Sequence, residues 1–138
     1  MFRMLKLSDE KIPDNILKEE FLQERAAVLG LAGEKVAAVL EKLYGIERGI
    51  EDRLIHFNRM TELCLTGCGD GKLTILRRKL LEKINAEIGR FNLEREYAKL
   101  RYYYLIVTRE AMGFYRHHWV EDMYRIPPGK QYLTEDNG

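Results

Sequence analysis

The sequence has 138 residues, a length that accommodates one domain and leaves no room for a second independent core. Hydrophobic residues make up 46% and charged residues 33%, a balance too apolar for a disordered chain and typical of long amphipathic helices. The 23 Lys and Arg residues nearly cancel the 22 Asp and Glu residues, and the net charge of +1 excludes a global field that would attract nucleic acid.

The expected location is the cytoplasm. No window of about 18 uninterrupted apolar residues exists, so we expect no transmembrane helix and no membrane insertion. The opening segment MFRMLKL is too short for the apolar core of a secretory signal. The two cysteines, Cys64 and Cys68, stand beside a glycine-rich segment rather than in a disulfide framework, and we expect reduced thiols.

The first predicted element is a helical arm over residues 12–66. Hydrophobic residues recur there every seven positions, a spacing that returns side chains to one helical face every two turns. This series consists of Leu22, Leu29, Val36, Leu43, Ile50, Phe57 and Cys64. Gly30 and Gly33 are the expected position of any break. A break there would shorten the molecule into a three- or four-helix bundle, and a continuous arm would give an extended hairpin.

A glycine cluster then predicts a bend near residues 66–71, because glycine supplies the positive φ values of a helix C-cap and a tight turn. The second predicted arm covers residues 71–125 and has the same length as the first. Its heptad series consists of Ile84, Phe91, Ala98, Leu105, Met112 and Trp119. Positions whose numbers add up to about 137 face each other in such a hairpin, which predicts an ion pair between Glu47 and Arg90.

These elements predict an all-α protein, a long antiparallel helical hairpin or coiled coil, or its shorter bundle form. A single domain covers residues 1–125. Pro127 and Pro128 stop a helix, so residues 126–138 are expected to form an irregular or disordered tail.

Two helices cannot surround a core, since each needs a stripe of about 100° or more covered. Residues 102–107 are apolar or aromatic on every side, and the aromatic segment GFYRHHW follows. One interpretation buries this region against a refolded N-terminal helix or an identical partner. The other makes it a docking surface for another protein, because Tyr and Trp are typical anchors of interfaces. The candidate partner-binding residues are Tyr103, Phe114, Tyr115 and Trp119.

No motif points to catalysis or to a cofactor, and we expect neither. A di-iron site needs two Glu-x-x-His pairs, which are absent from the sequence. On a continuous helix, Glu110, His117 and Glu121 would share one face, and a metal-dependent activity there is the enzyme hypothesis to test. Whether His117, His118 and Glu121 bind a metal stays open at this point.

The stretch from Ile16 to Leu54, together with LLEKINAEIGRFNLEREYAKLRYYYLIV in the second arm and its Asn-x-x-Arg at Asn92 to Arg95, resembles the bacterial flagellar export chaperones that escort hook-associated proteins. The resemblance implies a small cytoplasmic helical protein without catalysis. It also implies cargo contacts through C-terminal helical surface, near the four aromatic residues named above. The leading hypothesis is a protein-binding export chaperone or adaptor that holds a partner's amphipathic helix. The alternative is a structural coiled coil that forms a homodimer and has no separate client.

Overall fold

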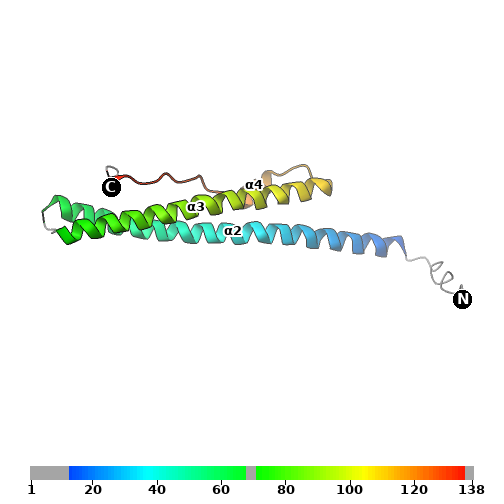
Figure 1. The fold of residues 1–138 in the computed structure, drawn as a ribbon. Coiled ribbons are helices and arrows are strands. Elements are labelled where there is room, and N and C mark those ends of the chain that lie inside the picture. The colour runs from blue at the N-terminus through cyan, green and yellow to red at the C-terminus, as the bar shows by residue number, and fades with distance from the viewer. Residues whose placement is uncertain (1–12, 68–70, 136–138) are drawn as a thin grey trace, which may run out of the picture.

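Two long antiparallel helices dominate the computed structural model, which describes residues 13–67 and 71–135 (Figure 1). Helix α2 spans Asp14–Leu65, helix α3 spans Gly71–Ala111, and a short helix α4 spans His118–Met123. Residues 124–134 have no helix or strand and run back along the hairpin toward the bend. The predicted all-α helical hairpin is confirmed, and the described residues contain no strand.

Helix α2 is continuous through both glycines at which a break was considered, so the molecule is an extended hairpin. Gly33 is buried, and a Cβ atom there would lie only 2.8 Å from the hydroxyl oxygen of Tyr124. The glycine therefore permits close approach of the C-terminal segment to α2. Gly30, by contrast, faces open space.

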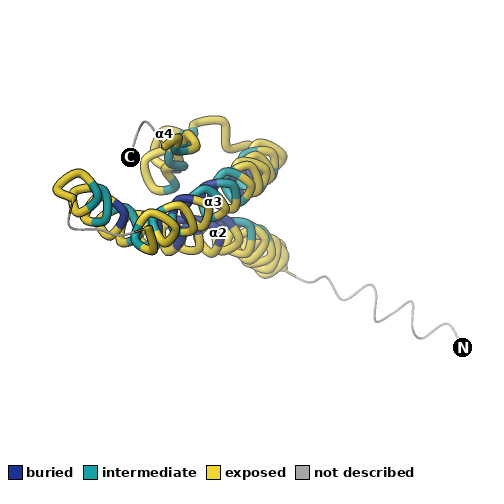
Figure 2. Tube along the Cα trace, turned by 60° about the vertical axis from the view of Figure 1, so that its left-hand side comes forward, coloured by how far each residue is buried: buried dark blue, intermediate teal, exposed yellow. Residues whose placement is uncertain are grey.

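The core is the seam between α2 and α3, where the buried residues face each other (Figure 2). Eight residues of the two predicted heptad series lie there, each at most 4% exposed: Val36, Leu43, Ile50, Phe57, Ile84, Phe91, Ala98 and Leu105. Leu22 belongs to the same series but is 61% exposed. Leu22 precedes Arg25, which contacts Met112 just beyond the last residue of α3, and the N-terminal end of α2 extends past α3 (Figure 1).

Cross-helix contacts confirm the predicted register. Lys42 Nζ lies 2.8 Å from Glu94 Oε1, and Arg77 Nε donates a hydrogen bond of 2.8 Å to Thr61 Oγ1. At the open end of the hairpin, opposite the bend, the guanidinium of Arg25 donates to the backbone oxygen of Met112.

The predicted ion pair between Glu47 and Arg90 is wrong. Arg90 instead lies 3.5 Å from Glu87 on its own helix. Glu47 pairs at 2.9 Å with Lys130 of the C-terminal segment. The prediction considered contacts between the two arms alone. It left out the C-terminal segment, whose Lys130 takes the place of Arg90 beside Glu47.

The sequence predicted a second helical arm as far as Arg125, and this prediction is wrong, because α3 ends before Gly113. Gly113 has a φ of +91°, a conformation that favours glycine. Its N–H donates to the backbone oxygen of Glu110 (3.0 Å), and the N–H of Phe114 donates to that of Arg109 (2.9 Å). This pair of bonds is the Schellman motif, which satisfies carbonyl groups at a helix C-terminus.

The early stop removes the end of the predicted core series. Trp119 lies on α4 and is 48% exposed, whereas its neighbour Val120 is 1% exposed and completes the core. Helix α4 thus covers the open end of the seam after the chain has reversed direction.

We call residues 124–135 the strap. They lie alongside α3 and run antiparallel to it (Figure 1). The tail predicted for residues 126–138 is irregular as far as it is described, but hydrogen bonds hold residues 127, 130 and 133 to α3. Residues 136–138 and Cys68 lie outside the described residues. Among the described helices, none combines the length and apolar character needed to cross a membrane.

Two glycine substitutions are predicted to have opposite effects on stability. Gly30→Ala should raise the free energy of unfolding by up to about 1 kcal/mol, because alanine is the better helix former and a Cβ there meets nothing within 4 Å. Gly113→Ala should lower it by about 1 kcal/mol or more, because a Cβ disfavours positive φ. Urea unfolding followed by circular dichroism measures both, and effects of the same sign would contradict the assigned backbone.

Candidate protein-binding surface

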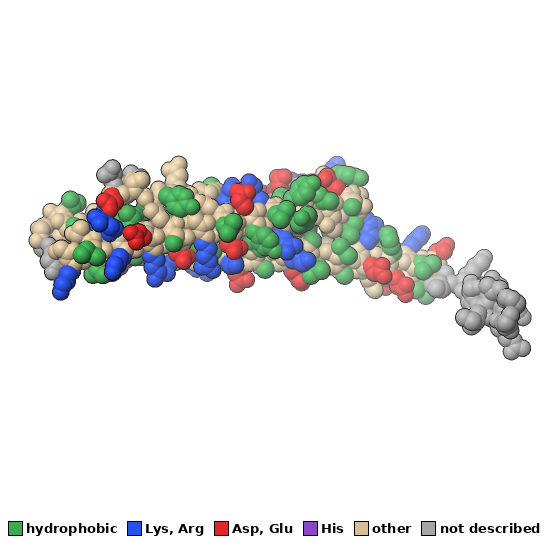
Figure 3. Space-filling view, viewed as in Figure 1, with side chains coloured by type: hydrophobic (Ala, Val, Ile, Leu, Met, Phe, Trp, Pro, Cys, Tyr) green, Lys and Arg blue, Asp and Glu red, His purple; other side chains and the backbone are tan. Residues whose placement is uncertain are grey.

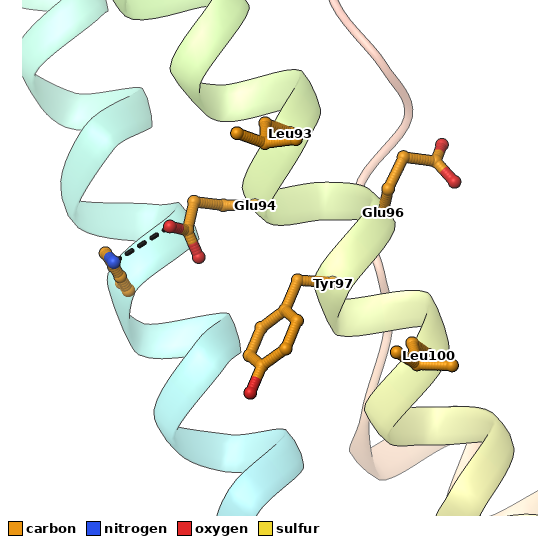
Figure 4. Close-up of a pocket in the computed structure, with 6 residues that line it drawn as sticks. Leu93, Glu94, Glu96, Tyr97 and Leu100 are labelled. Atoms are coloured by element: carbon orange, nitrogen blue, oxygen red, sulfur yellow. Dashed lines mark hydrogen bonds and ion pairs between the residues drawn. The ribbon is translucent and has the colours of Figure 1, made fainter.

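One long side of α3 carries exposed apolar residues that the intramolecular core does not use. They are spaced by four, three, four and three positions, which places them on one face of the helix. Each is between 42% and 72% exposed: Leu93, Tyr97, Leu100, Tyr104 and Val107. Figure 4 shows part of this stripe, with the strap passing behind α3.

Helix α2 adds a second exposed stripe, of which the part at Val28 and Leu31 lies beside the first. By helical spacing, its members share one face: Leu17, Phe21, Val28 and Leu31, each between 48% and 59% exposed. Val28 and Leu31 line a hollow of about 340 Å³ together with Tyr104 and Val107 of α3. We call the two stripes together the open face. A second hollow of about 510 Å³ lies farther along α3 at Leu93, where Tyr97 and Leu100 also line it (Figure 4).

Two basic residues, which we call the rim of the open face, lie where the stripes of α2 and α3 meet. Lys35 and Arg101 both line the smaller hollow, and neither forms an ion pair with any residue of the described ranges. The Arg101 guanidinium lies over the ring of Tyr97 at 5.0 Å, and its Nε donates to the Tyr97 hydroxyl at 3.0 Å. The stacking orients Arg101 and leaves its charge without an acidic partner.

The four candidate residues from the sequence do not form one cluster. Phe114, Tyr115 and Trp119 line a hollow of about 490 Å³ at the open end of the hairpin. Hydrophobic side chains gather over this end in Figure 3. Tyr103 lies on α3 beside Tyr104, with 6.1 Å between ring centroids, and so borders the open face. All four are exposed, by 46% to 72%, and their role in binding stays a prediction.

Arg109 is a buried charged residue, only 8% exposed, and it connects the segments that meet at the open end of the hairpin. Its Nη2 donates to the backbone oxygen of Arg116 (2.9 Å), and its Nε donates to His117 Nδ1 (3.3 Å). Its guanidinium also lies within 5.4 Å of the Phe114 ring and 5.0 Å of the Trp119 ring. No signal in the sequence distinguishes this arginine from the others, because its partners follow the unpredicted turn.

The proposed metal ligands do not converge. Since α3 ends before His117, the helical spacing that would align it with Glu110 and Glu121 does not apply. His117 Nε2 lies 3.6 Å from Glu110 Oε2, while Glu121 only donates its backbone N–H to the His117 carbonyl. Across residues 13–67 and 71–135, no group of three His, Cys, Asp or Glu side chains is placed to hold a metal ion.

Tyr102 carries a polar group into the interior of the structure. Its hydroxyl is buried and has no hydrogen-bond partner among the described residues. Burial raises the pKa of Tyr102, and the negative charge of Glu121 raises it further, against a smaller lowering by Arg109. The phenol therefore stays protonated at neutral pH.

No protein-family model, curated protein or solved structure matches this chain. The resemblance to flagellar export chaperones accordingly stays a prediction.

Arg109→Lys is predicted to loosen the open end, because lysine loses the planar stacking and one of the two hydrogen bonds. We expect the free energy of unfolding to fall by about 1–2 kcal/mol. Trp119 is the only tryptophan, so its fluorescence should shift to longer wavelength. Arg116→Lys, at an exposed position of the same loop, is the matched control and should change neither quantity. Equal effects of the two variants would contradict the role given to Arg109.

Proposed function

We propose that this protein is a non-enzymatic, protein-binding hairpin that holds an amphipathic helix of a partner protein on its open face. The observation that carries the proposal is the stripe of five exposed apolar residues at heptad spacing on α3. Such spacing is the pattern by which one helix packs against another. On the intramolecular seam the same pattern produces the core, and on the open face it has no partner among residues 13–67 and 71–135.

The dimensions of the stripe suit one docked helix. From Leu93 to Val107 the stripe is about 21 Å long at 1.5 Å per residue, which corresponds to four turns of a partner helix. Burying a Leu or Val side chain fully contributes about 1.5–3 kcal/mol. A handful of such contacts offsets the cost of association and of ordering the partner, so a helix of about 14 residues is sufficient.

The charges of the rim define the chemistry of the partner. Lys35 and Arg101 favour a helix that carries acidic residues beside its apolar stripe, since such residues would supply the missing counter-charges. The partner is therefore a helix with apolar positions at i, i+3 or i+4, and i+7, and with Asp or Glu on the flank that faces α2.

The resemblance to flagellar export chaperones supports a cytoplasmic chaperone or adaptor whose client is an exported helical protein. Tyr103 would contact the client at the border of the open face. Phe114, Tyr115 and Trp119 would contact a client helix only if it continues around the open end. A Trp119→Ala variant that binds the client as well as the wild type does would remove these three from the interface.

Affinity capture from the protein's own host tests the proposal with three baits. The wild type should capture a protein whose bound segment, mapped by hydrogen exchange on the purified pair, is an amphipathic helix with an acidic flank. Leu100→Glu places a charge on the open face and should weaken this binding at least tenfold. Leu65→Glu, at an 81% exposed position near the bend, is the matched control and should bind normally.

Two results would contradict the proposal. Equal binding by all three baits would place the client elsewhere on the surface. A wild-type protein that sediments as a dimer, together with a monomeric Leu100→Glu variant, would show that a second copy covers the open face. That outcome would favour the structural, self-associating coiled coil.

A further inference from the structure

The strap is bound to α3 chiefly through its backbone. Asn92 donates from Nδ2 to the Lys130 carbonyl oxygen and accepts from the Lys130 N–H at Oδ1, both at 2.8 Å. Asn85 makes the same two bonds to Leu133, at 2.9 and 2.8 Å. Each asparagine amide thus pairs with one residue of an extended chain as a neighbouring β-strand would.

The spacing of the two asparagines matches an extended chain. Asn85 and Asn92 are seven residues apart, which is about 10.5 Å along a helix. Lys130 and Leu133 are three residues apart, which is about 10 Å along an extended segment. Arg95 continues the row, because its Nε donates to the carbonyl oxygen of Pro127, three residues before Lys130, at 2.7 Å.

Strap side chains add to this backbone recognition, beginning with Tyr124 and Ile126, which pack half-buried against the core. Lys130 Nζ lies 2.9 Å from Glu47 Oε2 and 5.0 Å from the centre of the Phe91 ring. The Tyr132 ring lies against Gly89, where a Cβ would be 3.1 Å from its hydroxyl oxygen. Leu133 is half-buried against the core. The surface therefore selects an extended conformation, a basic residue and an apolar residue three positions later.

The strap lies on the surface of the hairpin and is not enclosed by it. From Ile126 to Glu135 no residue is buried, and its last ion pair, between Glu135 and Arg78, is solvent-exposed at 3.4 Å. The strap is therefore held by five hydrogen bonds to side chains of α3 and by half-buried contacts, without a buried core residue of its own.

We propose that Asn85, Asn92, Arg95, Phe91 and Glu47 form a second binding site, a receptor for an extended peptide segment of a partner protein with the pattern Lys-x-x-Leu. The chain's own strap fills this site when no partner is bound. The asparagine amides bond to backbone N–H and C=O groups, which every extended segment exposes. A segment of a partner protein can therefore form the same hydrogen bonds in place of the strap. The receptor residues occupy a different part of the α3 surface from the open face, and the proposal does not depend on the function given to that face.

A synthetic peptide with the strap sequence YRIPPGKQYLTE tests the site on the full-length chain. The variant Lys130→Glu/Leu133→Asp weakens the chain's own strap and leaves the receptor residues intact. Because a tethered strap competes at a high effective concentration, this variant should bind the labelled peptide at least tenfold more tightly than the wild type does. Adding Asn92→Ala should weaken peptide binding at least tenfold, and adding Asn58→Ala, at an exposed position on α2, should not.

A second test, which does not use the Lys130→Glu/Leu133→Asp variant, exchanges the charges of Glu47 on the chain and of the lysine on the peptide. Glu47→Lys also weakens the strap, and it should bind a peptide with Glu in place of Lys130 more tightly than it binds the natural peptide. Failure of both released chains to bind their peptides would overturn the proposal, as would binding that is insensitive to Asn92→Ala. A wild-type dimer that Asn92→Ala dissociates would also overturn it, because the strap of a second copy would then be the occupant.

Discussion

A pair of helices can bury only one stripe of each helix, and this constraint governs the whole molecule. The seam between α2 and α3 contains the fully buried side chains Phe57, Phe91, Leu43, Ile50 and Ile84, and it accounts for the register of the two helices. Everything on either side of the seam needs another cover. On one side of the seam α4 and the strap provide this cover, and on the other side no described residue covers the exposed apolar side chains.

The two sides of α3 differ in the chemistry by which they bind. Toward the strap, Asn85, Asn92 and Arg95 present hydrogen-bonding groups at a spacing that suits an extended backbone. Away from it, the stripe from Leu93 to Val107 presents only apolar and aromatic side chains at the spacing of a packed helix. An extended peptide has unpaired backbone groups to satisfy, whereas a helix has already satisfied its own. The hairpin is therefore suited to hold two segments of different conformation at the same time.

Heptad periodicity was sufficient to predict the fold class, and together with the glycine cluster that located the bend it predicted the register, because these follow from local spacing and from the absence of proline between the two ends of the hairpin. It was not sufficient for the end of α3, where one glycine, Gly113, acts through a Schellman motif that a hydrophobic pattern does not reveal. The strap was missed for a different reason. Asn85 and Asn92 look like ordinary polar helix positions, and their role depends on a chain segment about 40 residues away. The open face was not predicted either, because in the sequence a second apolar stripe looks the same as a stripe that is buried in the core. Only the structure shows that no described residue packs against it.

Solvent exposure of individual methyl groups in the isolated protein tests this account most directly. Nuclear magnetic resonance relaxation by a soluble paramagnetic agent measures it for each assigned Leu, Ile and Val. The account predicts strong relaxation of Leu93, Leu100 and Val107, weak relaxation of Ile84 and Leu105, and intermediate relaxation of Leu133, the half-buried leucine of the strap. Protection of Leu93 and Leu100 as complete as that of Leu105 would contradict it, since the open face would then be covered already.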